Sequence, residues 1–229
     1  MESSEFSFNL FLNYCINLQV LRLIHILPKI FIWKNLFLFL LLFAFLPSFA
    51  SEQGDSILFK RIVKMFKDDQ KWRIESYHLN KKGKSDYSQQ EIDRNWTVTD
   101  SLNLLEAKAI VNQYGFPGFS VVGESGSSKF WAIVQHCDDD VKFQQKVLKL
   151  MKAEVIKKNA DGGDFAYLTD RVLVNTNKKQ LYGTQTRLDK GKKKYIPLPI
   201  SNESMVDKRR MSVGLGSISE YLKSMNDRL

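Results

Sequence analysis

The sequence predicts a mainly α-helical single domain with one small β-hairpin in its C-terminal third, preceded by a signal peptide. Apolar residues recur at helical spacing along most of the chain after residue 50. Two short segments flank the turn-like stretch "DKGKKK" and predict the hairpin. A short, very apolar block ends in a small-residue pattern near residue 50.

The signal peptide is predicted from the block "LFLFLLLFAFL" (36–46). Two lysines precede this block, and "SFA" (48–50) follows it with small residues at a cleavage position. The block is shorter than the roughly 20 residues that span a bilayer, so an uncleaved N-terminal anchor is the less favoured alternative. We therefore expect residues 1–50 to be removed and residues 51–229 to form one helical domain.

The expected location follows from this signal. Because 50 residues is long for a signal peptide, residues 1–28 are hypothesised to be an over-extended gene start. The protein is expected to be exported, and to be periplasmic or extracellular after cleavage near Ala50. It would contact a membrane only through an uncleaved signal segment. Nucleic acid is not an expected partner, because the protein is exported and its lysines are spread along the chain.

The helices after residue 50 are predicted from apolar spacing and from start and stop signals. The expected helices are 55–79, 90–98, 101–114, 129–136, 139–158, 165–174, 205–211 and 217–225. Asp100 and Asp138 are expected to cap the helices that follow them. The stretch "GFPGFSVVGESGSS" (115–128), rich in Gly and Ser, is expected to be a loop. The segments 182–188 and 194–198 are expected to pair as the hairpin.

His136 is the leading candidate for a catalytic residue. It ends an apolar helical segment in "VQHCDDD", two residues before Asp138. An imidazole can exchange protons near neutral pH, so His136 is a candidate general acid or base, with Asp138 or Asp170 to orient it. The alternative is a histidine that caps its helix by hydrogen-bonding an open carbonyl, and the sequence alone favours this alternative slightly.

Asp170 and Arg171 form a charged pair inside the apolar segment "AYLTDRV". Adjacent helical residues point about 100° apart, so a mutual salt bridge is not expected. Each side chain is expected to find a partner elsewhere, unless one of them faces water.

Hydrogen-bonding side chains crowd the stretch "QLYGTQ" (180–185), which precedes the hairpin. Two arginines in "VDKRRMSVGL" resemble an anion clamp, because a guanidinium offers a planar fork to carboxylate or phosphate. The alternative for these arginines is a basic surface run. The candidate ligand-binding residues are Gln135, Arg171, Gln180, Tyr182, Thr184, Gln185, Arg209 and Arg210.

No metal site or cofactor is expected. After residue 50 the sequence has two histidines, His78 and His136, and the single cysteine Cys137. Their spacing is not typical of zinc ligands, and one cysteine cannot form an internal disulfide.

The series "GFPG", "VQHCDDD", "AYLTDRV", "QLYGTQ" and "VDKRRMSVGL", in this order, resembles a bacterial family catalogued as domain of unknown function six-six-two-four. The resemblance covers about residues 68–221 and implies no established activity. It implies polar family positions at Gln70, Arg73, Gln135, His136, Asp138, Asp170, Arg171, Gln180, Tyr182, Gly183, Thr184, Gln185, Asp207, Arg209 and Arg210. Cys137 departs from the pattern, since members often have alanine there, and this argues against a thiol mechanism.

Two functions are consistent with the sequence. In the first, the chain is an exported, hydrolase-like enzyme with a polar centre built from His136, "YGTQ" and arginines. Its ligand would be a small molecule or a cell-envelope component, and the arginines favour an anionic one. In the second, the chain is a non-catalytic binding or scaffold domain of the cell envelope, whose polar residues form a structural network. An open cleft would favour the first function, and full burial with mutual hydrogen bonds the second.

Overall fold

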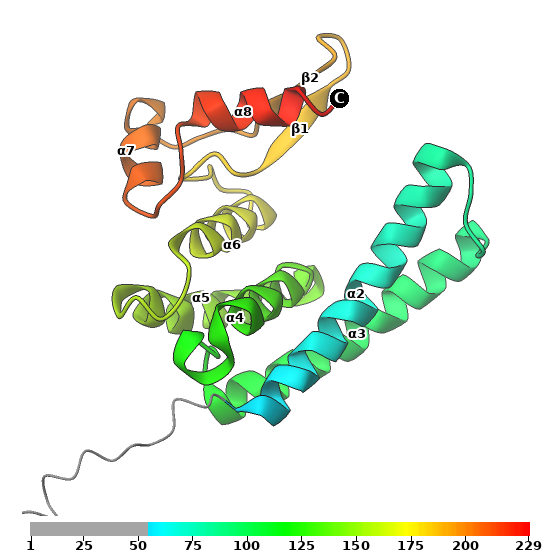
Figure 1. Ribbon diagram of the computed structural model, residues 1–229. Helices are drawn as coiled ribbons and strands as arrows, with labels where there is room; N and C mark the ends of the chain where they lie inside the picture. Colours follow the sequence, from blue (N-terminus) through cyan, green and yellow to red (C-terminus); the bar gives the residue numbers. More distant parts are fainter. Residues whose placement is uncertain (1–54) are drawn as a thin grey trace, which may run out of the picture. The chain divides into compact units, whose positions relative to one another are not determined.

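The computed structural model describes residues 55–229, which form α-helices and one two-stranded antiparallel hairpin (Figure 1). The helices are α2 (Ser56–Lys82), α3 (Gln89–Tyr114), α4 (Phe119–Gln135), α5 (Val141–Ile156), α6 (Gly162–Asn175), α7 (Val206–Met211) and α8 (Ile218–Asn226). The strands are β1 (Thr186–Asp189) and β2 (Lys194–Pro197). The predicted class, mainly helical with one small hairpin, is confirmed for this part of the chain. The predicted signal peptide lies outside the described residues.

α2 is an amphipathic helix whose buried face follows helical spacing. Leu58, Ile62 and Met65 are buried, and Asp69 continues the same face one turn further on. The carboxylate of Asp55 accepts hydrogen bonds from two backbone N–H groups of the first turn and so starts the helix. Neither α2 nor any other helix of residues 55–229 combines the length and apolarity needed to cross a bilayer.

One continuous helix, α3, occupies the region where two helices were predicted. Ser88 and Glu91 form a capping box, and the helix runs from there without a break to Tyr114. The side chain of Asp100 accepts hydrogen bonds from the side chains of Arg73 and Trp96. The predicted cap at Asp100 is therefore wrong, because partners on α2 and one turn earlier in α3 occupy its carboxylate.

α4 contains a segment that was predicted to be a loop. Residues 119–128 are helical, apart from a kink at Gly123, where φ is 69°. A Cβ atom at Gly126 would lie 2.9 Å from Cδ2 of Phe59, so the missing side chain lets α4 approach α2 closely. The small residues serve helix packing here, and the loop prediction for 119–128 is wrong.

The cap of α5 is Asp140 and not the predicted Asp138. The Asp140 carboxylate accepts a hydrogen bond of 2.9 Å from the N–H of Phe143. Asp138 lies in the 3-10 turn Asp138–Asp140, and its side chain turns toward α6. The structure therefore corrects the capping role and gives Asp138 a partner in another helix.

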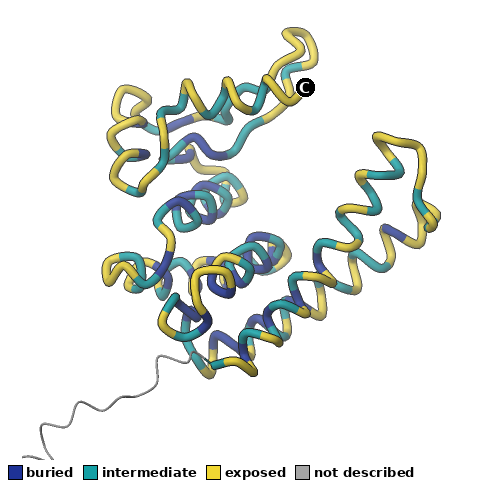
Figure 2. The backbone as a smooth tube through the Cα atoms, viewed as in Figure 1, coloured by how far each residue is buried: buried dark blue, intermediate teal, exposed yellow. Residues whose placement is uncertain are grey.

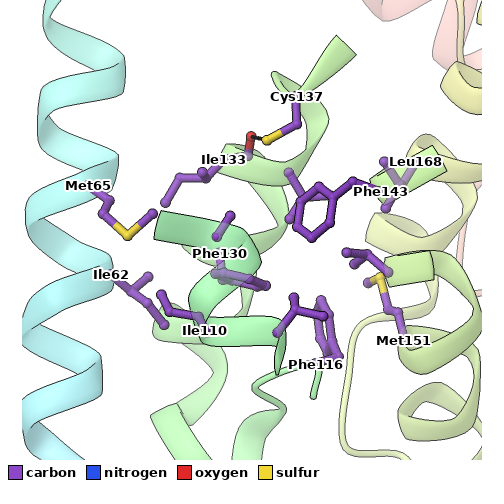
Figure 3. Close-up of a cluster of buried hydrophobic side chains, with 14 of the residues drawn as sticks. Ile62, Met65, Ile110, Phe116, Phe130, Ile133, Cys137, Phe143, Met151 and Leu168 are labelled. Atoms are coloured by element: carbon purple, nitrogen blue, oxygen red, sulfur yellow. Dashed lines mark hydrogen bonds between the residues drawn. The ribbon is translucent and has the colours of Figure 1, made fainter. Parts of the chain in front are cut away.

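The hydrophobic core is formed by α2 to α6 (Figure 3). Its members include Ile62, Met65, Ile110, Phe116, Phe130, Ile133, Phe143, Met151 and Leu168. The ring of Phe130 is fully buried and meets that of Phe116 edge-on, with centroids 5.9 Å apart. Figure 2 shows buried positions on the packed sides of the helices, whereas the connection between α2 and α3 is exposed.

The predicted hairpin is confirmed by the antiparallel pairing of β1 with β2, in which Asp189 lies opposite Lys194. The first strand begins at Thr186 and not at the predicted residue 182. Helix α8 lies beside β2 (Figure 1). The side-chain oxygen of Asn226 in α8 accepts a hydrogen bond of 2.6 Å from the N–H of Tyr195. The last helix thus covers the outer edge of β2, which would otherwise expose unpaired backbone groups.

Candidate functional site

His136 contacts the buried carboxylate of Asp69, which is not among the predicted site residues. Its Nδ1 lies 2.9 Å and 3.0 Å from the two oxygens of Asp69. The Asp69 side chain is 1% exposed, whereas that of His136 is 25% exposed. An ionised carboxylate can only accept hydrogen bonds, so we assign the proton of this contact to Nδ1. Nε2 makes no hydrogen bond to any residue of 55–229 and is left to accept a proton.

The carboxylate of Asp69 has a signal in the sequence. Leu58, Ile62, Met65 and Asp69 are spaced four, three and four residues apart, so Asp69 continues the buried stripe of α2. A carboxylate on an apolar face needs a partner, because burying an unpaired charge is costly. His136, the residue that follows α4, supplies one, and its side chain meets Asp69 instead of capping an open carbonyl.

Two further side chains, those of Gln70 and Arg73, contact Asp69. Gln70 Nε2 donates a hydrogen bond of 2.7 Å to it, and Arg73 Nη1 forms an ion pair with it at 2.9 Å. Arg73 Nη2 lies 3.1 Å and 3.0 Å from the two oxygens of Asp100. Burial raises the pKa of Asp100, and the charge of Arg73 opposes this rise. We call Asp69, Arg73, Trp96, Asp100 and His136 the Asp69–His136 cluster.

Asp138 contacts α6 and not the imidazole of His136. Its carboxylate accepts hydrogen bonds from Arg171 Nε and Nη2 and from Asn175 Nδ2. Gln144 Nε2 adds a hydrogen bond of 3.1 Å. Burial alone would raise the pKa of Asp138, but the bonds from Arg171 and its charge hold it below its usual value. The expectation that Arg171 finds a partner away from Asp170 is confirmed.

Asp170 binds the backbone of the "QLYGTQ" stretch. The side chain is fully buried. Its Oδ1 accepts hydrogen bonds from the N–H groups of Leu181 at 2.7 Å and Tyr182 at 3.0 Å. Its Oδ2 accepts from the N–H of Thr184 at 2.9 Å and from the Thr184 hydroxyl at 3.0 Å. Asp170 therefore fixes a loop, and neither it nor Asp138 is the residue that contacts His136.

The side chain of Gln180, at one end of the same stretch, forms hydrogen bonds with the backbone of Gln185 at the other end. Its side-chain Nε2 donates to the carbonyls of Gln185 and Leu198, at 2.9 Å and 2.7 Å. Its Oε1 accepts a hydrogen bond of 2.9 Å from the N–H of Gln185. Gly183 has φ 71°, a conformation that favours glycine. Burial raises the pKa of the Tyr182 hydroxyl, and the charge of Asp170 adds to this effect.

The two arginines of α7 also bind this stretch through its carbonyls. Arg209 donates to the carbonyls of Leu181 and Ser201, at 2.6 Å and 2.7 Å. Arg210, which is buried, donates to those of Tyr182 and Gly216, at 2.8 Å and 2.6 Å. Backbone carbonyl oxygens therefore accept the hydrogen bonds of both guanidinium groups. An anion would have to displace these oxygens in order to bind there.

Gln135 and Cys137 flank His136 but are buried. The Oε1 atom of Gln135 is buried and has no hydrogen-bond partner among residues 55–229. Burial raises the pKa of the Cys137 thiol to about 12, so its thiolate is scarce near neutral pH. A buried thiol of this kind is a poor nucleophile.

The predicted site residues therefore form separate hydrogen-bonded groups. His136 belongs to the Asp69–His136 cluster, Asp138 pairs with Arg171, and the "QLYGTQ" side chains belong with Asp170 and the α7 arginines. No hydrogen bond between residues 55–229 joins His136 to the "QLYGTQ" stretch. One surface hollow, of about 550 Å³, lies between α2 and the α2–α3 connection, and another, of about 210 Å³, lies between α2 and α3; neither is lined by any of the predicted site residues.

A family model described as Family of unknown function (DUF6624) matches residues 58–229. The chain therefore belongs to this family, as its motif series predicted. No curated protein and no solved structure matches the chain.

Proposed function

We propose that this chain is an exported, hydrolase-like enzyme in which His136 acts as general base and Asp69 orients it. The contact between the His136 imidazole and the buried Asp69 carboxylate carries the proposal. A carboxylate that binds Nδ1–H selects the tautomer whose Nε2 is unprotonated, and it stabilises the imidazolium formed when Nε2 takes a proton. Export is proposed from the sequence pattern of residues 1–50 alone.

The exposure of the two partners supports this role. The Asp69 side chain is shielded, so its interaction with an imidazolium is screened less by water. The imidazole is a quarter exposed, so Nε2 can reach a water molecule or a substrate hydroxyl. Asp138 lies two residues after His136 in the chain and pairs with Arg171 of α6, and we propose that this partly exposed ion pair borders the ligand, a small molecule or cell-envelope component.

The test is a hydrolysis panel of chromogenic carboxylic esters, phosphate esters and glycosides, run on wild type, His136→Gln, Asp69→Asn and His78→Gln. We expect wild type to cleave one class and His136→Gln to lose at least about 100-fold in rate. Asp69→Asn should also lose rate, because an amide can present an N–H to Nδ1 and favour the wrong tautomer.

His78→Gln is the matched control, because it removes the other histidine of the described chain. It lies nine residues from Asp69 on α2, about 13 Å along the helix. Its activity should equal that of wild type. Full activity in a folded His136→Gln variant would refute the proposal.

The second candidate function is a non-catalytic binding or scaffold domain of the cell envelope. The engaged side chains of Gln180, Thr184, Arg209 and Arg210 favour it, because they form a structural network instead of facing a ligand. Wild type that cleaves no class of the panel, yet gains thermal stability with a cell-envelope glycan or lipid fraction, would support this function over the first.

A further inference from the structure

We infer that Arg73 is a positioning residue that holds Asp69 in its contact with His136, an inference that rests on the proposed role of His136. Arg73 Nη1 pairs with Asp69 at 2.9 Å, and Arg73 Nη2 lies within 3.1 Å of both oxygens of Asp100. The Arg73 side chain is 17% exposed. A guanidinium can bridge two carboxylates in this way because its N–H groups form a rigid fork.

The guanidinium of Arg73 is itself held on several sides. Its Nη1 donates to the backbone carbonyl of Asp69 at 2.9 Å. It stacks over the ring of Trp96, 4.7 Å from the centroid, and Trp96 Nε1 donates to Asp100 at 2.8 Å. A cation over an indole ring is attracted to it. Arg73 and Asp69 therefore have little freedom to leave the geometry that aims the carboxylate at Nδ1.

The charges of the cluster point to the same role. Asp69 and Asp100 carry two negative charges and Arg73 one positive charge, so the three sum to minus one. A protonated His136 would bring the Asp69–His136 cluster to neutrality. Without Arg73, a nearly fully shielded Asp69 would keep only His136 and the Gln70 amide as partners. No cation from α2 would then fix the orientation in which its oxygens meet Nδ1–H.

The experiment reads the tautomer of neutral His136 from its ring ¹⁵N chemical shifts at alkaline pH, in wild type, Arg73→Gln and Arg73→Lys. We expect wild type to be more than about nine-tenths Nδ1–H. Arg73→Gln should move at least about half of the population to the Nε2–H form, which imidazole prefers in water. Arg73→Lys should fall between them, because an ammonium restores the charge without the fork.

The matched control is Arg61→Gln, because Arg61 also links α2 to α3, through Glu106. It should leave the His136 tautomer unchanged. If Arg73→Gln does not fold, Asp100→Asn is read in its place, since it removes the outer anchor of Arg73 and should shift the tautomer in the same direction. A folded Arg73→Gln variant, or Asp100→Asn in its place, with the wild-type tautomer would overturn the inference.

The tautomer is measured without a substrate, so this test is separate from that of the proposed function. A wild type that holds Nδ1–H through Arg73 but cleaves nothing would leave the positioning role standing and refute catalysis. Loss of hydrolysis in His136→Gln, together with an unchanged tautomer in Arg73→Gln, would support catalysis by His136 and refute the positioning role of Arg73.

Discussion

Removal of the Asp170 carboxylate is expected to destabilise the fold by about 3–5 kcal/mol. The Asp170→Ala variant leaves the N–H groups of Leu181, Tyr182 and Thr184 and the Thr184 hydroxyl without their acceptor. A buried polar group without a partner costs about 1–3 kcal/mol. Thr184 is 3% exposed, so the loss of its N–H bond and of its hydroxyl bond should each cost this full amount. The N–H groups of the partly exposed Leu181 and Tyr182 can form hydrogen bonds with water instead.

The neighbouring residue provides the control. Arg171→Ala breaks an ion pair with Asp138 whose side chains are 30% and 40% exposed. Exposed pairs contribute about 0–1 kcal/mol, so this variant should lose no more than that. The two substitutions remove charged groups from adjacent positions of α6, and they differ mainly in what those groups bind.

The assay is urea unfolding followed by tryptophan fluorescence and circular dichroism. Both variants should unfold with the slope of wild type, so that the change in midpoint reports the change in free energy of unfolding. A loss below about 1 kcal/mol for Asp170→Ala, or a loss no larger than that of Arg171→Ala, would show that Asp170 does not fix the loop.

Two further predictions concern Gly183 and Asp164. Gly183→Ala should cost about 2–4 kcal/mol, because its φ is 71° and a Cβ would lie 2.4 Å from Cδ1 of Ile218. The control Gly83→Ala should cost only about 1 kcal/mol, since Gly83 has φ 62° but nothing within 4 Å of a Cβ, and equal losses would contradict the steric argument. Burial, with the charge of Asp161, raises the pKa of Asp164 to about 7 from 3.8. The folded chain therefore binds this proton more tightly than the unfolded chain, so this contribution is greatest below pH 3.8 and is lost as pH rises toward 7. Asp164→Asn should thus gain stability relative to wild type between pH 4 and pH 8 in urea unfolding, and a difference that does not change with pH would contradict it.

The helices were predictable where apolar spacing alone decides, as in α2, α6 and the short C-terminal helices. The prediction failed where a residue has two physical uses. Asp100 reads as a cap, but in the fold it binds Arg73 from the neighbouring helix. Gly126 reads as a loop residue, but in α4 it makes room for Phe59. Both uses depend on a partner that is distant in sequence, which local propensity does not specify.

The candidate site was predictable to a different degree. His136 was identified from its chemistry, and Asp69 could have been found from its place in the buried stripe of α2. The partners of "QLYGTQ" could not, because Asp170 and Arg210 bind backbone groups, which every residue carries. Gln180, Arg209 and Arg210 therefore bind the backbone of their own chain, a use that their residue types do not indicate, and their predicted role in ligand binding stays a prediction.

The two buried carboxylates, Asp69 and Asp170, are equally shielded, yet their partners give them different roles. Asp170 accepts hydrogen bonds from backbone N–H groups and a hydroxyl, none of which changes charge near neutral pH, and these bonds hold a loop in place. Asp69 accepts a hydrogen bond from an imidazole, a kind of group that can gain a proton near neutral pH. The Nε2 atom of this imidazole makes no hydrogen bond to any residue of 55–229. Burial makes the contacts of Asp170 and of Asp69 costly to break. Only the contact of Asp69 involves a group, the imidazole of His136, that can take up or release a proton near neutral pH. The identity of the donor, more than the burial of the acceptor, therefore makes His136 the position where chemistry should be sought.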